Sequence, residues 1–479
     1  MKRIFLPLVI LLSTMSFMAS CLGDDTEYAT YYSDTAITAF SLGTLNRTVD
    51  TISSTGEDSS YTTTVTGSNY AFYIDQAQGL IYNNDSLPLG TDAEHVICSV
   101  SSKNSGLIVI KYIDSDTLDY YSSTDSIDFT SPREFRVYST DGQSYRKYTV
   151  SVNVHQEAAD SFNWSNPATI SDFTNFTGMK AVALNDNLLL FGSNGSNTTI
   201  YATNIEDGSS WSEYTTNITL DADAYKNAVA FSDYVYTISN GSIYLTKDGT
   251  NWTEISDGTS YDGSGKVSQL IGGGSEYLYA LNTDGGISIS KDNGFTWAKD
   301  SIVANSPMLP VQNLGAGYFA LKTNDDTERI IMTGLRNITE HPSDSVTMVW
   351  SKLEEYASGS NQHGWIYYDE VNGQQLPSLT NIQMIRYGDV LVAMGGTPLG
   401  TTTATAFSNI YTSEDNGISW QDNDSYVLPE GFTNNGSDVF AISTDKNKRL
   451  WIIYGGDGTV WRGRLNKLGW TTYQKSFTE

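Results

Sequence analysis

SKDNGFTW, residues 290–297, places an aspartate, a glycine and a tryptophan at fixed offsets. A near copy, SEDNGISW, occupies residues 413–420, and a shortened copy, TKDGTNW, occupies residues 246–252. An aspartate side chain accepts hydrogen bonds from the backbone of its own turn, and glycine supplies the positive φ that a tight reversal needs. The tryptophan adds a large apolar wedge to the strand that follows. We therefore interpret each copy as a structural turn between two strands.

The positions that these copies share are predicted to be structural, with no catalytic role. They are Asp248, Trp252, Asp292, Gly294, Trp297, Asp415, Gly417 and Trp420. Two weaker copies, NIEDGSSW from residue 204 and LNKLGW from residue 465, keep the glycine and the tryptophan but lose other parts of the turn. Such graded decay is expected of a folding element.

The chain from residue 156 onward repeats a unit of two apolar strands, a polar turn and a tryptophan. The first strands are LLLFG, YVYTIS, YLYALNT, YFALKT, VLVAMGG and LWIIYGG, and the tryptophans are Trp211, Trp252, Trp297, Trp365, Trp420 and Trp470. A four-stranded blade cannot bury both of its faces alone, so such units pack side by side. We predict an all-β protein with a six-bladed β-propeller over residues 156–479, and seven blades as the alternative.

Two stretches bear on how the ring is built. Trp164, in DSFNWSNP, precedes the first unit and resembles another outer strand, which either closes the last blade or counts toward a seventh. LEEYASGSNQHG, residues 353–364, is interpreted as an expanded turn before Trp365. Its acidic pair, Glu354 and Glu355, is best explained by a solvated loop.

Residues 35–155 are predicted to form a separate β-sandwich domain. Short alternating strands begin with TAITAFSL, and FRVYS and YTVSVNV flank Asp141 and Gly142, a strong hairpin signal. The opening strand and the closing hairpin resemble Ig-like domains of bacterial surface lipoproteins. That resemblance implies the architecture alone.

The first residues indicate export. Lys2 and Arg3 precede the apolar run IFLPLVILL, which is too short to span a membrane, and MASC follows at 18–21. MASC resembles a bacterial lipobox, in which Cys21 is lipidated; an ordinary signal peptide is the alternative. We predict a signal peptide over 1–20 and a tether over 21–34. LGDDTE, directly after Cys21, resembles the export tags of surface-exposed outer-membrane lipoproteins.

The composition excludes several classes of partner. A formal net charge of −28 repels a phosphate backbone, and no Lys/Arg stripe offsets it, so we predict no nucleic-acid partner.

Cys98 is the single cysteine besides Cys21, so we expect a small core residue and no internal disulfide. No histidine has a partner at metal-ligand spacing, and we predict neither a metal nor a cofactor.

The aspartate turns resemble the Asp boxes of sialidases. In those and other propellers the motif joins the outer two strands of a blade, away from the axial pocket. A sialidase-like hydrolysis needs a tyrosine nucleophile paired with a glutamate, an acid/base aspartate and three arginines. The arginines in the propeller region are Arg329, Arg336, Arg386, Arg449, Arg462 and Arg464, and the Arg-Ile-Pro signature is absent.

Over its full length the chain resembles a family of uncharacterised surface lipoproteins from gut commensals, with an N-terminal Ig-like domain and a C-terminal propeller of unknown function. The likeness is carried by residues 70–91, 125–142 and 457–470. It implies a fold and a location, but no activity.

Three functions remain open. The first is a non-enzymatic binding protein, anchored by its lipid, whose propeller presents a site for a glycan or a surface-protein partner. The second is an exo-acting glycoside hydrolase of the sialidase-like type, and the third is a structural assembly module. Acidic residues or arginines converging on the axis would favour the enzyme, whereas aromatic residues along one rim would favour binding.

Overall fold

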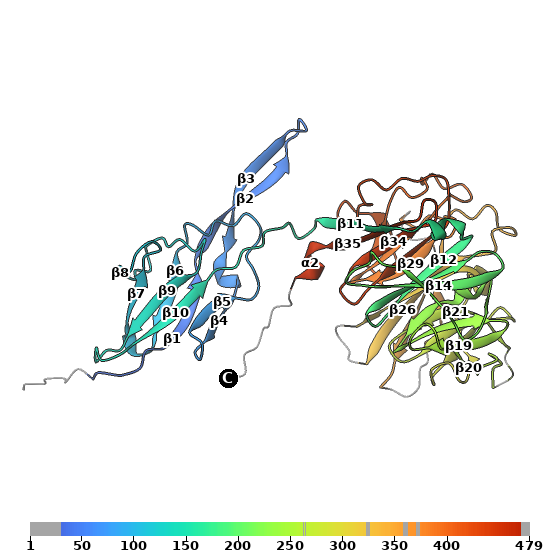
Figure 1. Cartoon of the computed structure of the whole chain (residues 1–479), viewed down its shortest axis with the longest axis horizontal. Helices are drawn as coiled ribbons and strands as arrows, with labels where there is room; N and C mark the ends of the chain where they lie inside the picture. Colours follow the sequence, from blue (N-terminus) through green and yellow to red (C-terminus); the bar gives the residue numbers. More distant parts are fainter. Residues whose placement is uncertain are drawn as a thin grey trace, which may run out of the picture. The chain divides into compact units, whose positions relative to one another are not determined.

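The computed structural model describes residues 30–261, 263, 265–321, 326–357, 363–369 and 374–470. The chain divides into two compact units, one ending at Glu157 and the other spanning Ala158–Trp470. Each unit is built almost entirely of β-strands (Figure 1). The composition, rich in β-branched and aromatic residues with few helix-forming runs, favours this outcome.

The first unit is an N-terminal β domain. Its main sheet has the strand order β4-β5-β10-β9-β7-β8, while β1 pairs with β6 and β2 pairs with β3. The elements are β1 (Ile37–Leu42), β2 (Thr44–Ile52), β3 (Asp58–Thr66), η2 (Gly67–Asn69), β4 (Phe72–Asp75), β5 (Leu80–Asn83), β6 (Cys98–Ser102), η3 (Lys103–Ser105), β7 (Leu107–Lys111), β8 (Leu118–Tyr120), β9 (Arg133–Tyr138) and β10 (Tyr145–Ser151).

Two predictions for this unit are confirmed. Strands β9 and β10 pair antiparallel, and Gly142 in the connection has a φ of 70°, as a hairpin at that site requires. Cys98 is a buried core residue that shares a cluster with Phe135 and Tyr148. Burial raises the pKa of the Cys98 thiol to about 12, so the thiol is unreactive at neutral pH.

The second unit is a multi-bladed β-propeller whose blades are four-stranded sheets. The sheets are β12-β13-β14-β15 with β16 beside β14, then β17-β18-β19-β20, β21-β22-β23-β24, β25-β26-β27-β28, β29-β30-β31-β32 and β11-β35-β34-β33. The elements are β11 (Phe162–Thr169), η4 (Ser171–Asn175), β12 (Gly178–Leu184), β13 (Asn187–Ser193), β14 (Asn197–Asn204), β15 (Ser212–Tyr214), β16 (Leu220–Asp221), η5 (Ala224–Asn227), β17 (Val229–Phe231), β18 (Tyr234–Ser239), β19 (Ser242–Thr246), β20 (Thr253–Ser256), β21 (Val267–Gly273), β22 (Leu278–Asn282), β23 (Ile287–Ser290), β24 (Ala298–Lys299), η6 (Ser306–Met308), β25 (Gln312–Ala320), β26 (Thr327–Leu335), β27 (Met348–Glu355), β28 (Ile366–Tyr367), β29 (Gln383–Tyr387), β30 (Val390–Met394), β31 (Tyr411–Ser413), β32 (Gln421–Asp422), β33 (Phe440–Thr444), β34 (Leu450–Tyr454), β35 (Thr459–Leu465) and α2 (Asn466–Gly469).

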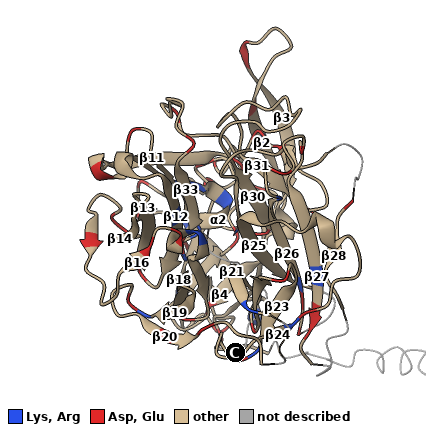
Figure 2. Ribbon diagram, turned by 90° about the vertical axis from the view of Figure 1, so that its right-hand side faces the viewer, with Lys and Arg blue, Asp and Glu red and all other residues tan. Residues whose placement is uncertain are grey.

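One edge strand of each sheet lies at the centre of the propeller. Strands β12, β17, β21, β25, β29 and β33 contact each other in this order, and β33 contacts β12 again. Figure 2 shows β12, β21, β25 and β33 around a common centre. We call these the inner strands. Apolar clusters fill the space between neighbouring sheets, so each blade buries its faces against the next.

The last sheet is completed by the strand that contains Trp164. Strand β11 pairs antiparallel with β35, and Trp164 lies opposite Gly463. The indole N–H of Trp164 donates to the carbonyl of Val427 at 2.8 Å. The prediction of an outer strand at Trp164 is confirmed. Of the two roles considered for this strand, it completes the last sheet of the chain.

Three sequence predictions about the repeat are wrong. YFALKT is predicted as the first of the two repeated strands, but it belongs to the inner strand β25. The strand that corresponds to the other first strands is β26. The pattern misplaces it because three consecutive strands there are similarly apolar. LNKLGW contains the short helix α2 instead of an aspartate turn. The residues Leu353–Glu355 continue strand β27, so the expanded turn begins later than predicted.

Candidate functional site

The turn at residues 290–297 uses its own polar groups. Asp292 accepts hydrogen bonds from the backbone N–H of Thr296 at 2.8 Å and from the Thr296 hydroxyl at 2.6 Å. Ser290 donates to Asp292 at 2.9 Å and accepts from the N–H of Gly294 at 2.8 Å. Burial acts to raise the pKa of Asp292, but the hydrogen bonds from Thr296 outweigh it and hold the pKa below its ordinary value.

The other two turns repeat this geometry. Asp415 accepts from the N–H of Ser419 at 2.8 Å, and Asp248 accepts from the N–H groups of Thr250 and Asn251, both at 2.8 Å. Each indole N–H donates to the carbonyl of the glycine three residues earlier, from Trp252 to Gly249, from Trp297 to Gly294 and from Trp420 to Gly417. The carboxylates therefore serve the turns that contain them.

The tryptophans of these turns pack between blades. Trp297 is fully buried and shares an apolar cluster with Tyr236, which belongs to the preceding sheet. Trp252 and Trp420 occupy the corresponding clusters between their own neighbouring sheets. Each tryptophan thus directly precedes the outer strand of one blade and packs that blade against its neighbour.

The aspartate turns lie at the opposite end of the propeller from the start of the inner strands. Adjacent strands of each sheet are antiparallel, so the first and third strands run in the same direction. Each turn follows a third strand and therefore lies where the inner strand of its sheet ends. A ligand site at the other end of the axis has no contact with these turns.

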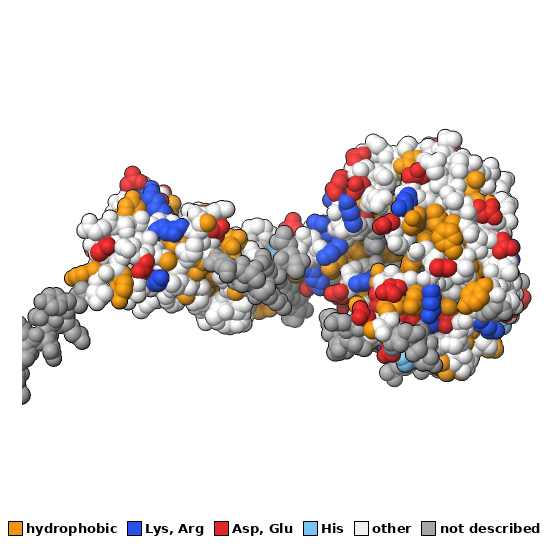
Figure 3. Space-filling model, turned by 90° about the horizontal axis from the view of Figure 1, so that it is seen from below, with side chains coloured by type: hydrophobic (Ala, Val, Ile, Leu, Met, Phe, Trp, Pro, Cys, Tyr) orange, Lys and Arg blue, Asp and Glu red, His pale blue; other side chains and the backbone are white. Residues whose placement is uncertain are grey.

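The inner strands surround an axial cavity of about 320 Å³, and a wider cavity of about 590 Å³ lies where they begin. We call the wider cavity the axial mouth. Its polar lining comes from inner strands and from the segments that precede them, and includes Asp223, Lys226, Gln269, Asn313, Asn381 and Asp438. Figure 3 shows one face of the molecule, where acidic, basic and hydrophobic side chains all occur on the propeller.

Lys180, on β12, lines the axial cavity between the mouth and the centre. Its Nζ donates to the backbone carbonyl of Lys226 at 3.2 Å. Burial lowers the pKa of Lys180 to about 8. At slightly alkaline pH, Lys180 is therefore a neutral amine in a substantial fraction of the molecules.

Amide side chains dominate the mouth. Asn313 and Asn381 have left-handed backbones, with φ of 53° and 50°, and Asn313 lies in a register shift of β25 between Gln312 and Gly315. Such a bulge changes the direction of the side chains next to it. Here it lies in the part of β25 that lines the mouth. Asn381 donates to the carbonyl of Asp438 at 2.8 Å. Sequence reasoning missed these residues because single amides scattered over different blades form no motif.

The two carboxylates of the mouth are already engaged. Asp223 forms an ion pair with Lys226 at 2.6 Å. Asp438 accepts from the backbone N–H of Thr397 at 3.0 Å and from its hydroxyl at 2.9 Å.

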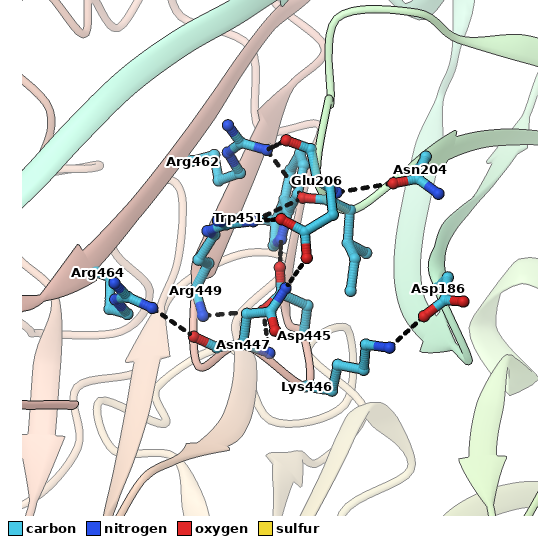
Figure 4. Close-up of polar contacts among 11 residues, drawn as sticks. Asp186, Asn204, Glu206, Asp445, Lys446, Asn447, Arg449, Trp451, Arg462 and Arg464 are labelled. Carbon is cyan, nitrogen blue, oxygen red and sulfur yellow. Dashed lines mark hydrogen bonds and ion pairs between the residues drawn. The ribbon is translucent and has the colours of Figure 1, made fainter. Parts of the chain in front are cut away.

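The arginines do not converge on the axis. In the described part of the chain only Arg386 among them lines the axial cavity, and it stacks over Phe319 at 4.9 Å while donating to the carbonyl of Tyr318. Figure 4 shows Arg449 paired with the carboxylate of Glu206, which follows β14, and Arg462 bound to the backbone carbonyl of the same residue. Arg464 donates to the carbonyl of Asn447, Arg336 pairs with Asp344, and Arg329 donates to Ser351 and Tyr368.

The prediction of a solvated Glu354 is wrong. Glu354 lies on β27 and is fully buried beside Lys352 and Tyr279. Lys352 and Glu354 are two residues apart on one strand and so share a face, which was a usable signal. Glu355 points to the other side and lies 3.5 Å from His363.

The remaining predictions concern the lipidated cysteine, metal binding and membrane-spanning segments. Cys21 lies outside the described residues. Within the described ranges no cluster of three His, Cys, Asp or Glu side chains could hold a metal, and no helix there is long and apolar enough to cross a membrane.

Comparison with known proteins gives a family. The chain matches the model of the DUF6242 beta propeller domain over residues 158–473 and that of the DUF6242 N-terminal domain, a domain of unknown function, over residues 40–152. No curated protein matches the chain.

Many solved structures are similar at low identity. YCF48 from Cyanidioschyzon merolae is 14% identical with a TM-score of 0.32, covering 63% of this chain and 98% of that chain. Trypanosoma rangeli sialidase in complex with the inhibitor DANA is 9% identical with a TM-score of 0.36, covering 60% and 55%. PorZ, a surface component of the type-IX secretion system of Porphyromonas gingivalis, is 9% identical with a TM-score of 0.38, covering 88% and 62%. The chain belongs to the DUF6242 family, which combines an N-terminal domain with a β-propeller domain of unknown function.

Proposed function

We propose that this protein is a surface lipoprotein whose propeller binds a neutral glycan at the axial mouth without hydrolysing it. In this proposal residues 1–20 are a signal peptide, Cys21 carries the lipid, and 21–34 are a tether. Residues 35–155 form an Ig-like sandwich that acts as a spacer. Residues 156–479 form a six-bladed ring on the outer face of the outer membrane.

The observation that carries the proposal is the polar lining of the mouth. Gln269 and Asn313 line it together with Tyr225. An amide both donates and accepts hydrogen bonds, as a sugar hydroxyl does, so a ring of amides suits a neutral polyhydroxyl ligand. The cavity also disfavours a purely structural module, which needs no concave site.

A glycoside hydrolase remains the second candidate, because Asp223 and Asp438 line the same cavity. Hydrolysis of that kind needs one carboxyl group to deliver a proton and another to act as a nucleophile or base. Here Lys226 and Thr397 already occupy the two carboxylates. Their engagement favours binding over turnover.

A glycan array probed with the purified full chain tests the proposal, with released sugar measured on every hit. We expect binding to a neutral glycan and no released sugar. Released sugar would favour the hydrolase instead, and an array without any bound glycan would remove the support for a glycan ligand.

A further inference from the structure

A buried lysine bridges two neighbouring blades. Lys352, on β27, places its Nζ 2.7 and 2.6 Å from the two carboxylate oxygens of Asp300, which directly follows β24 of the preceding sheet. The side chain of Lys352 is 1% exposed and that of Asp300 is 9% exposed. The amine therefore faces the carboxyl group squarely in a site with little water.

A second carboxylate lies beside this pair. Glu354 Oε1 is 2.9 Å from the Nζ of Lys352 and accepts a hydrogen bond from the Tyr279 hydroxyl at 2.6 Å. Its other oxygen, Oε2, is buried and has no hydrogen-bond partner. Burial and the nearby Glu354 carboxylate raise the pKa of Tyr279, so the phenol remains a hydrogen-bond donor.

The surroundings polarise the Asp300 carboxyl group and exclude solvent. The indole N–H of Trp365 donates to Asp300 Oδ2 at 2.9 Å. Trp365 and Tyr279 are fully buried in the apolar cluster between the two sheets. Removing a lysine and a carboxylate from water is costly, and an ion pair in such a site recovers that cost only with excellent geometry.

We propose that Lys352 and Asp300 join in an intramolecular amide bond, with Glu354 as the proton carrier. The Nζ–Cγ bond forms, one Cγ–O bond of Asp300 breaks, and one water molecule leaves. Glu354 transfers two protons in turn from Nζ to the departing oxygen and ends as it began. The Trp365 N–H stabilises the oxygen that remains, and no oxidant or reductant takes part.

The arrangement meets the physical needs of this reaction. The contact distances hold the two reacting groups together, which removes most of the entropic cost of their encounter. The free oxygen of Glu354 is available to deliver the proton. The product replaces a desolvated ion pair by a neutral amide and ties the sheet β21-β24 covalently to the sheet β25-β28.

Mass spectrometry of the full chain under denaturing conditions tests the proposal. After trypsin digestion, the wild-type protein should give a branched peptide in which Lys352 is uncleaved and linked to the peptide that begins at Asp300, lighter by one water than the two parts. Unlinked peptides from the folded wild-type protein would overturn the proposal, and this result needs no variant.

Variants separate the roles of the three side chains. Lys352→Arg and Asp300→Ala should give only unlinked peptides. Asp300→Asn should give the same branched peptide as the wild type, because loss of ammonia then replaces loss of water. Glu354→Gln should leave the peptides largely unlinked, and full linkage in that variant would contradict the role of Glu354. Linkage at Lys352 in Asp300→Ala would contradict the assigned acceptor.

Discussion

Trp164 stacks its indole over the backbone of Gly463, opposite it in the pair of strands β11 and β35. A Cβ atom at Gly463 would lie 2.5 Å from the indole ring, so glycine is the residue that this closure accommodates. The strand at the start of the propeller is thereby joined to the strand at its end.

Gly463→Ala should therefore destabilise the propeller by about 1–3 kcal/mol, because the added methyl group overpacks the contact with Trp164. Denaturant unfolding measures the change in the free energy of unfolding. Gly286→Ala is a suitable control, since its nearest neighbours are side-chain atoms at 3.3 Å or more and its φ is not positive. Equal stability of Gly463→Ala and wild type would contradict this account of the closure.

Trp297→Ala should lower the free energy of unfolding by about 3–5 kcal/mol, because it empties a large site between two blades. Phe295, in the same turn, is 55% exposed, and Phe295→Ala should change the stability by less than about 0.5 kcal/mol. Urea unfolding followed by fluorescence compares the two variants. Similar losses in both would show that the indole is not the wedge that joins the blades.

Asp292→Ala should cost about 1 kcal/mol at neutral pH, a modest loss because the carboxylate is exposed to solvent. The pKa of Asp292 is lowered in the folded protein. Its contribution to stability is therefore fully present above the unfolded pKa of about 3.9 and is lost as the pH falls through the folded value. The stability difference between wild type and variant should shrink below about pH 4. A difference that grows on acidification would contradict the hydrogen-bonded carboxylate.

Lys180 and Lys226 should react differently with an acylating reagent. Burial lowers the pKa of Lys180 to about 8, whereas at Lys226 burial is outweighed by the hydrogen bond to Asp223, which raises the pKa. Labelling of Lys180, followed by mass spectrometry, should be half-maximal near pH 8, and that of Lys226 at a pH above the ordinary lysine pKa. Identical pH profiles would show that Lys180 is not desolvated by the cavity wall.

Cys21→Ala should release the protein from membranes, because the proposed lipid is its anchor. Fractionation of cells into membrane and soluble parts, with the wild-type chain as the reference, measures the distribution. A variant that stays with the membrane fraction would refute lipidation at Cys21 as the anchor.

The parts of the fold that the sequence reveals are those with local signatures. The turns at Asp248, Asp292 and Asp415 are recognisable because donor, acceptor and tryptophan lie within one short stretch. The repeat pattern misplaces a strand in the sheet β25-β26-β27-β28 because β25, β26 and β27 are all apolar, so hydropathy alone does not separate an inner strand from its neighbours. Glycine and tryptophan at the end of LNKLGW were not sufficient for a turn without the aspartate.

The candidate site is harder to predict from the sequence than the turns are, for a physical reason. Gln269 lies on β21, Asn313 lies on β25 and Asn381 precedes β29, so the three residues meet only when the ring closes. Glu354 looked exposed because its partner Tyr279 belongs to another blade, distant in the sequence. Contacts between blades leave no periodic trace, whereas strands and turns do.

The central claim is that the axial mouth binds a neutral glycan. Its most direct test is the equilibrium affinity of the full chain for a glycan found on the array, measured for wild type, for the double variant Gln269→Ala with Asn313→Gly, in which glycine accepts the positive φ of Asn313, and for Phe295→Ala at the opposite end of the propeller. The account predicts that the double variant binds at least about fivefold more weakly, since each of the two lost hydrogen bonds contributes roughly 0.5–1.5 kcal/mol, while Phe295→Ala binds like wild type. Unchanged affinity in the double variant, or loss of binding in Phe295→Ala, would contradict it.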